Sequence, residues 1–160
     1  TTQELGVPLS ISVEALKKFA GVSRRQEILF NEKNIVFIDD FAHHPTAIKN
    51  TLDGLRKKVK KGRIIALIEL RSNTMQSGLH DKQLKNSVKN ADFIYWKGKN
   101  KDQVNSLIAS SLGKSKSIDS IDETVIDLME NIRSGDILIT MSNGDFGGLI
   151  GKLSNSLKSL

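Results

Sequence analysis

The chain has 160 residues, of which 38% are hydrophobic and 26% charged, a composition typical of about one globular domain and not of a disordered or low-complexity protein. No apolar run approaches the ~20 residues that span a membrane, and the absence of cysteine excludes disulfides, thiolate catalysis and cysteine-ligated zinc and is in keeping with the cytoplasm. Lys and Arg number 24 against 18 Asp and Glu, and this positive excess is compatible with an anionic partner but identifies none.

The N-terminal segment is predicted to be a connector followed by a helix, which Ser12 caps and which runs to Ala20. Because the chain starts with Thr1 rather than Met, we expect it to be a piece of a longer protein. Two β-rich runs follow, Glu27–Phe30 and Ile35–Asp39. The short polar turn between these runs predicts a β-hairpin.

Beyond the hairpin, helix-like and strand-like segments alternate. Pro45 is favoured in the first turn of a helix, and the continuous apolar run at 63–70 predicts a buried strand. The predicted helices cover 45–61, 80–89, 102–112, 121–132 and 146–160, and the predicted strands cover 63–70, 92–96, 116–118 and 136–141. This alternation predicts a three-layer α/β fold: a mainly parallel, Rossmann-like sheet with helices on both faces and the hairpin as an antiparallel edge.

The densest positive cluster is the segment Arg56–Arg63, at the predicted end of a helix that Gly62 stops. Cations are favoured there by the helix dipole, so a solvated helix end is the preferred interpretation. A nucleic-acid-binding module is the alternative, and a steep salt dependence of binding would support it. Aromatic residues for base stacking are scarce, with one Trp, one Tyr and six Phe, and we expect no nucleic acid partner.

Polar residues collect directly after three of the predicted strands, in the segments Asp39–Pro45, Glu69–Met75 and Thr140–Gly148. In an open parallel sheet, ligands bind beyond the carboxyl ends of the strands. We therefore expect these three segments to meet at one edge of the sheet and to form the functional site.

The first segment holds two carboxylates and two imidazoles, those of Asp39, Asp40, His43 and His44. This set could bind a metal ion, as in a metal-dependent phosphohydrolase. It could equally bind a nucleotide, through a ribose hydroxyl and a phosphate at a helix N-terminus. A structural interpretation is also open, in which one Asp caps the helix at Pro45 and one His fills a surface niche.

The other two segments offer groups that bind anions. The guanidinium of Arg71 suits a carboxylate or a phosphate, although it could instead pair with Glu69 or lie in a solvated loop. Ser142–Gly148 supplies hydroxyl, amide and unobstructed backbone N–H groups before a helix. No Walker-type phosphate loop is present, because Gly113–Ser115 lacks the required earlier glycine and has Ile108 in its place.

These segments resemble the C-terminal domain of the Mur ligases, the ATP-dependent amide-forming enzymes of peptidoglycan assembly. The resemblance rests on Phe19–Glu27 and on Asp39–Ile48, which contains an aspartate-aromatic-small-His-x-Pro core between a strand and a helix. Within the family, Arg71–Met75 and Met141–Gly148 are most similar to the murein peptide ligases, which recycle the cell-wall tripeptide. The alternative is the UDP-N-acetylmuramate–L-alanine ligases, which carry a His-Arg-Tyr type sequence where this chain has Leu70–Ser72.

The resemblance implies a three-domain enzyme, in which residues 1–20 connect from a central ATPase domain and 21–160 form the C-terminal domain. ATP and Mg²⁺ would be bound mainly by the central domain, where the carboxylate of UDP-N-acetylmuramate is activated as an acyl phosphate. The C-terminal domain would close over the nucleotide and deliver the amine of the acceptor peptide, L-alanyl-gamma-D-glutamyl-meso-diaminopimelate. No nucleic acid and no membrane partner is implied.

Carried over residue by residue, the resemblance assigns nucleotide binding to Arg25 and Asp40, with Asp40 on the ribose, and a catalytic position near the phosphates to His43. Acceptor binding is assigned to residues of two strand exits: Arg71, Ser72, Asn73, Ser142 and Asn143. No metal ligand is assigned. Two positions depart from the family, because Leu70 replaces a proline before the acceptor arginine and Asp145 replaces a glycine.

Overall fold

The computed structural model describes residues 2–19, 21–59 and 61–160. Its strands are β1 (Glu27–Glu32), β2 (Ile35–Asp40), β3 (Ile64–Leu70), β4 (Phe93–Gly98), β5 (Ser115–Ser117) and β6 (Ile137–Met141). Its helices are α1 (Leu9–Lys18), α2 (Pro45–Lys58), α3 (Asn73–Gln76), α4 (Asp81–Ser87), α5 (Lys101–Ala109), α6 (Ile121–Asn131), α7 (Leu149–Lys158) and the short 3-10 helix η1 (Phe146–Gly148). Within these ranges no helix has both the length and the apolar character to cross a membrane.

The strands form one sheet in the order β1-β2-β6-β3-β4-β5. β1 pairs antiparallel with β2, and every other pairing is parallel. The predicted α/β fold with an antiparallel edge hairpin is therefore confirmed. Because β6 inserts between β2 and β3, the exits of three strands that are far apart in the sequence become neighbours.

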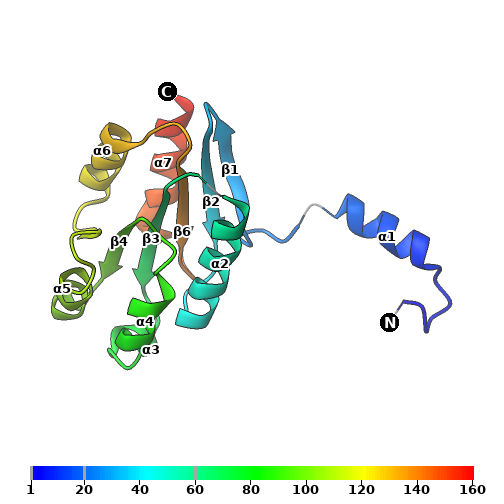
Figure 1. Ribbon diagram of the computed structural model, residues 1–160, viewed down its shortest axis with the longest axis horizontal. Coiled ribbons are helices and arrows are strands. Elements are labelled where there is room, and N and C mark those ends of the chain that lie inside the picture. The colour runs from blue at the N-terminus through cyan, green and yellow to red at the C-terminus, as the bar shows by residue number, and fades with distance from the viewer. Residues whose placement is uncertain (1, 20, 60) are drawn as a thin grey trace.

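Helices cover both faces of the sheet and make the three layers. One face buries the apolar sides of α2, α4 and α5, through residues such as Ile48, Leu84 and Leu107. The other face buries α6 and α7, and in α7 the apolar residues Leu149 and Leu153 recur at helical spacing. Helix α1 stands apart from this body in Figure 1 and buries none of its residues.

Several predicted boundaries need correction. Helix α1 begins at Leu9 after Pro8, so Ser12 lies inside the helix and its hydroxyl donates to the Pro8 carbonyl instead of capping. The predicted end at Ala20 lies outside the described residues. Helix α2 ends at Lys58 with Val59 as its C-cap, so Gly62 is not the helix stop. A β-carbon on Gly62 would lie 2.3 Å from the Gly135 carbonyl oxygen, which explains the glycine by close backbone approach.

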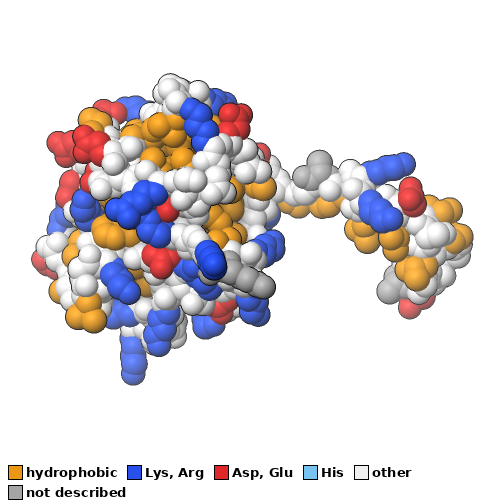
Figure 2. Space-filling model, turned by 45° about the horizontal axis from the view of Figure 1, so that its top comes forward, with side chains coloured by type: hydrophobic (Ala, Val, Ile, Leu, Met, Phe, Trp, Pro, Cys, Tyr) orange, Lys and Arg blue, Asp and Glu red, His pale blue; other side chains and the backbone are white. Residues whose placement is uncertain are grey.

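The basic segment at the end of α2 is a helix end whose two arginines are paired with acidic residues. Arg56 pairs with Asp92 and donates to the carbonyls of Gly62 and Asn90. Arg63 pairs with Asp136. Figure 2, turned toward the end of the sheet where the parallel strands begin, shows Lys and Arg interspersed with acidic and hydrophobic side chains. This arrangement favours the solvated helix end over the nucleic-acid-binding interpretation.

Candidate functional site

The three polar segments meet at one edge of the sheet, as the sequence predicts. The β2–β6 register ends with Asp40 opposite Met141, and the β3–β6 register ends with Ile68 opposite Met141. The backbone N–H of Ser142 donates to the Asp40 carbonyl at 3.2 Å, which continues the contact past the strand ends.

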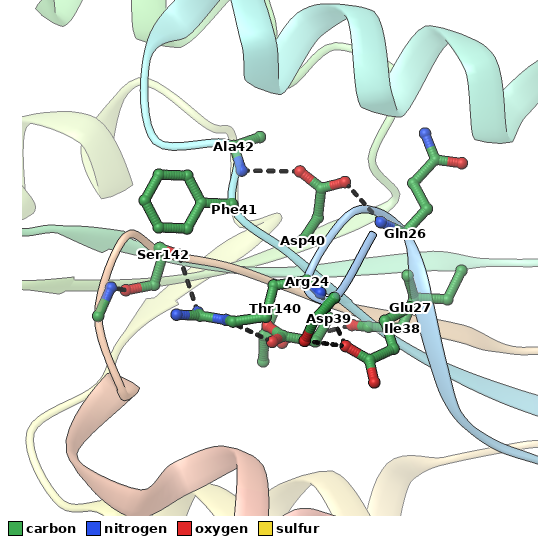
Figure 3. A network of polar contacts seen from close by, with 12 residues as sticks. Arg24, Gln26, Glu27, Ile38, Asp39, Asp40, Phe41, Ala42, Thr140 and Ser142 are labelled. Carbon is green, nitrogen blue, oxygen red and sulfur yellow. Dashed lines mark hydrogen bonds and ion pairs between the residues drawn. The ribbon is translucent and has the colours of Figure 1, made fainter. Parts of the chain in front are cut away.

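Asp39 anchors the turn before β1 to the exit of β6. Its side chain is 4% exposed and accepts from Arg24 Nε and from Thr140 Oγ1, each at 2.8 Å. Arg24 also donates through Nη2 to the Ser142 carbonyl at 2.9 Å. Figure 3 shows Arg24 reaching between the two segments. The Asp39 carboxylate is thus hydrogen-bonded within the protein, and it holds Arg24 and Thr140 in place instead of contacting a ligand.

Asp40 joins two loops. Its carboxylate, also 4% exposed, accepts from the backbone N–H of Ala42 at 2.7 Å and of Gln26 at 2.9 Å (Figure 3). Gln26 has a positive φ of 51°, which is uncommon for a residue with a side chain, and the bond to Asp40 holds it there. The N-cap of α2 is His44, without a side-chain cap bond, so neither Asp caps this helix.

The start of α2 presents an aromatic and cationic surface. The guanidinium carbons of Arg24 and Arg25 lie 5.6 and 5.4 Å from the centre of the Phe41 ring, within cation–π range. The His43 ring meets the Phe41 ring edge-on at 5.4 Å, and its Nδ1 lies 3.0 Å from the Phe41 carbonyl. Because a carbonyl only accepts, Nδ1 carries the proton and Nε2 is left for another partner. Sequence reasoning missed Phe41 as the platform of this surface.

The two histidines separate in the fold. His44 is exposed and contacts His80 edge-on, with the ring centres 4.9 Å apart. Across 2–19, 21–59 and 61–160, no three His, Asp or Glu side chains come together as metal ligands. Asp39 and Asp40 already hold protein donors. The geometry therefore does not favour the metal-dependent phosphohydrolase.

Arg71 leaves β3 and lies across the exit of β6. A β-carbon on Gly144 would be 1.5 Å from Arg71 Nη1 and 2.6 Å from Cζ, so the guanidinium occupies the space that a side chain would need. The alternative pairing of Arg71 with Glu69 is wrong. Glu69 instead accepts from Lys97 Nζ at 3.0 Å and from the Ser142 hydroxyl. Arg71 is exposed and its guanidinium makes no ion pair within the described part of the chain.

The remaining predicted acceptor residues divide into surface and interior groups. Ser72 caps α3 by accepting from the Met75 N–H, and Asn73 is exposed at the start of α3. Ser142 is fully buried, and its hydroxyl is satisfied there by donating to Glu69 and accepting from the Gly144 N–H at 2.9 Å. Asn143 is half-buried, and its Oδ1 has no hydrogen-bond partner among the described residues.

Asp145 has a local structural role. Its Oδ1 accepts from the Gly147 N–H at 3.1 Å and so caps η1. That bond lowers the pKa of the Asp145 carboxyl below its usual range, and the positive charges of Arg71 and Lys97 lower it further. Lys97 also lies 5.3 Å from the centre of the Phe146 ring. The part-buried ion pair of Glu69 and Lys97 was not predicted from the sequence, although the charged Glu69 inside the apolar run of β3 was a signal for it.

A cleft of about 300 Å³ opens beside Arg71, at the ends of β3, β4 and β5. It is lined by Glu69, Leu70, Arg71, Gln76, Lys97, Gly98, Lys99, Lys101, Ile118 and Asp119. The sequence predicts Arg71 at this edge of the sheet but does not predict the cleft, because Lys97, Lys99 and Lys101 lie at the end of β4 and the start of α5, where no polar motif stands out.

Comparison with known proteins places these features in a family. The family model described as "Mur ligase, glutamate ligase domain" matches residues 24–144. The UDP-N-acetylmuramate–L-alanyl-gamma-D-glutamyl-meso-2,6-diaminoheptandioate ligase of Escherichia coli is 35% identical over 164 residues, which is 97% of this chain and 35% of that protein. The UDP-N-acetylmuramate–L-alanine ligase of Streptococcus agalactiae is 33% identical over 142 residues, 87% of this chain and 28% of that protein. The chain thus spans about a third of the length of these relatives.

Two solved structures are similar along the chain. The murein peptide ligase of Psychrobacter arcticus superposes with a TM-score of 0.77 at 34% identity, over 99% of this chain and 35% of that one. A crystallised domain of a putative UDP-N-acetylmuramate:L-alanyl-gamma-D-glutamyl-meso-diaminopimelate ligase from Haemophilus ducreyi gives a TM-score of 0.69 at 37% identity. That match covers 83% of this chain and 99% of the crystallised domain.

Proposed function

This chain belongs to the Mur ligase family, through its glutamate ligase domain, and from that premise we propose that it is the C-terminal domain of an ATP-dependent ligase. The ligase joins UDP-N-acetylmuramate to the peptide L-alanyl-gamma-D-glutamyl-meso-diaminopimelate in the cytoplasm, in peptidoglycan recycling. The observation that carries this proposal is the exposed Arg71 guanidinium, which lies against Gly144 at the meeting point of three strand exits.

Residues 1–20 are proposed to belong with a preceding central domain, and 21–160 to form the C-terminal domain. Two observations support this division. Helix α1 buries none of its residues, and it exposes Leu9 and Leu16, followed by the exposed C-cap Phe19, which a preceding domain would cover. The crystallised Haemophilus ducreyi domain corresponds to most of the chain, which supports a separately folding unit.

The nucleotide is proposed to bind over the start of α2, where Arg25 and His43 Nε2 face ATP phosphates. The exposed Arg25 and the uncapped N-terminus of α2 suit an anion. Asp40 keeps acceptor capacity beyond its two backbone bonds and is assigned to the ribose. Mg²⁺, which would neutralise phosphate charge, is assigned mainly to the central domain.

The acceptor is proposed to bind at the exits of β3 and β6. Arg71, Ser72 and Asn73 form the surface that holds the peptide carboxylates. Ser142 and Asn143 act behind that surface, since the Ser142 hydroxyl already bonds Glu69 and the Gly144 N–H. The free amine of the held peptide then attacks the acyl phosphate carbon, phosphate leaves, and the amide bond forms with loss of a proton from the amine.

The size of the site favours a peptide over the single amino acid of the L-alanine ligases. The cleft beside Arg71 adds about 300 Å³ to the site, in the direction of β5, and L-alanine has no groups to fill it. The test is a ligation assay with the full-length protein, UDP-N-acetylmuramate and ATP. We expect ADP release and product only with the tripeptide. Faster ligation of L-alanine than of the tripeptide would contradict the proposal.

A further inference from the structure

Arg24 lies in the loop before β1 (residues 21–26), and its backbone is fixed there independently of its side chain. Its φ is 57°, a positive value that is uncommon for a residue with a side chain. The Arg24 N–H donates to Glu27 Oε2 at 2.7 Å, and the Arg24 carbonyl accepts from the Phe41 N–H at 2.7 Å. Because both bonds use backbone groups of Arg24, they persist when its side chain is replaced.

The Arg24 side chain leaves this loop and contacts the exits of β2 and β6. Nε donates to Asp39 Oδ2 at 2.8 Å, Nη2 donates to the Ser142 carbonyl at 2.9 Å, and the guanidinium carbon lies 5.6 Å from the centre of the Phe41 ring. Figure 3 shows the guanidinium between Asp39 and Ser142. The donors of a guanidinium point in fixed, different directions and can serve both partners at once, whereas the single ammonium of a lysine cannot.

The Ser142 carbonyl that Arg24 holds belongs to the exit of β6, the segment Ser142–Gly144. The Ser142 hydroxyl accepts from the Gly144 N–H at 2.9 Å, and the Arg71 guanidinium lies against Gly144. A continuous set of contacts therefore runs from the loop before β1, through Arg24 and Ser142, to the surface on which the acceptor is proposed to bind. The contact between Arg24 and Ser142 is the step of this set that joins the nucleotide side to the acceptor side.

We propose that Arg24 is a positioning residue for the ligation: from the nucleotide side of the site, its guanidinium fixes the exit of β6 in the arrangement that the acceptor needs. This inference rests on the proposed function and adds to it a residue that acts through Ser142 instead of touching a substrate. Without the guanidinium, peptide binding must itself order the exit of β6, so the apparent affinity for the peptide falls. The loop that carries Arg25 keeps its backbone bonds, so nucleotide binding is unaffected.

The test compares Arg24→Lys with Arg56→Lys in the full-length ligase. A lysine at position 24 keeps the positive charge beside Asp39 but cannot also reach the Ser142 carbonyl. Arg56 is the matched control, because it too combines an ion pair, with Asp92, and hydrogen bonds to backbone carbonyls, at the opposite end of the sheet. We expect the two variants to lower the urea midpoint of unfolding by similar amounts.

In steady-state kinetics, Arg24→Lys should raise the KM for the tripeptide about fivefold, the equivalent of one net hydrogen bond, and leave the KM for ATP unchanged. Arg56→Lys should change neither KM. Equal rises in both KM values of Arg24→Lys would mean that the variant only loosens the fold, and no rise in either would mean that the exit of β6 is ordered without Arg24. Both results would overturn the inference while ligation itself persists.

Amide hydrogen exchange of the same proteins without substrates gives a measurement that does not depend on ligation. The Gly144 N–H should exchange about fivefold faster in Arg24→Lys than in the wild type or in Arg56→Lys, because the exit of β6 opens more often. Equal exchange of Gly144 in all three proteins would overturn the inference whatever the kinetics show. No ligation of any peptide by the wild-type enzyme would refute the proposed function and the acceptor role of Arg24 with it, while faster exchange in Arg24→Lys would still show that Arg24 orders the exit of β6.

Discussion

The guanidinium of Arg71 rests on the backbone of Gly144, at a separation that leaves no room for a β-carbon: one built there would lie 1.5 Å from Nη1. This contact joins the exits of β3 and β6, so the orientation of an anion-binding side chain on one strand depends on a residue of the other. Gly144 has no positive φ, so its backbone conformation does not require glycine. The lack of a side chain at this position instead leaves room for the Arg71 guanidinium.

Gly144→Ala is therefore expected to displace Arg71 without unfolding the domain. The clashing atoms are the far end of an exposed side chain, so the free energy of unfolding should change by no more than about 0.5 kcal/mol. The KM for the acceptor peptide should rise as much as in Arg71→Ala, and the double variant should add nothing further. Additive losses in the double variant would show that Gly144 acts independently of Arg71.

Arg71→Lys tests the bidentate guanidinium itself. A lysine keeps the charge but cannot form the two parallel bonds of a guanidinium to a carboxylate, so the KM for the peptide should rise while the KM for ATP stays nearly constant. If the contact forms only in the transition state, kcat falls instead. Equal losses for ATP and peptide would mean that Arg71 serves domain closure, and its acceptor role would have to be abandoned.

Much of the fold follows from the sequence. The apolar run Ile64–Ile68 predicts the central strand β3, and the alternation of helices and strands predicts the parallel sheet. Helix α3 was missed, because four residues capped by Ser72 have no periodicity. The last helix starts at Leu149 instead of Phe146, because Gly147 and Gly148 adopt positive φ values of 65° and 81° that interrupt it.

The candidate site is only partly readable from the sequence. The meeting of three strand exits was predicted from topology, because parallel strands present their carboxyl ends at one edge. The hydrogen-bond partners of the individual side chains were not predicted. Arg24 reaches Ser142 across 118 positions, and Asp40 binds the Gln26 N–H, contacts that depend on where β6 enters the sheet. Local spacing therefore identifies the chemistry of the site, and the tertiary fold decides which carboxylates remain available.

Asp40→Ala should affect both stability and nucleotide binding. It leaves the N–H groups of Gln26 and Ala42 without their acceptor, and the unsatisfied donor of the buried Ala42 alone costs about 1–3 kcal/mol. Urea unfolding of the chain measures the first effect, and ATP titration of the folded full-length variant measures the second. If the folded variant binds ATP as the wild type does, Asp40 supports the two loops only.

Tyr95 is expected to make stability fall at alkaline pH. Burial raises the pKa of its phenol, and the hydrogen bond to Asp127 at 2.7 Å raises it further. Above the ordinary pKa of about 10, the unfolded chain loses this proton while the folded chain keeps it, so the unfolded state binds fewer protons and the free energy of unfolding decreases as pH rises. Thermal unfolding between about pH 9 and 11 should show a steeper loss for the wild type than for Tyr95→Phe. Parallel pH profiles would contradict this expectation.

The chain of 160 residues by itself is expected neither to hydrolyse ATP nor to form an amide bond. It contains no Walker-type loop to hold the phosphates, and the described residues bring no three metal ligands together. Its exposed Arg25 and Arg71 and its half-buried His43 are proposed to act on substrates that another domain activates, so they have nothing to act on when the chain is alone. ADP release and ligated product should be measured with UDP-N-acetylmuramate, ATP, Mg²⁺ and the tripeptide, beside an Arg71→Ala variant as a control for contaminating activity. Ligation by the purified chain that disappears in Arg71→Ala would show that it holds a complete active site, and the three-domain proposal would then be wrong.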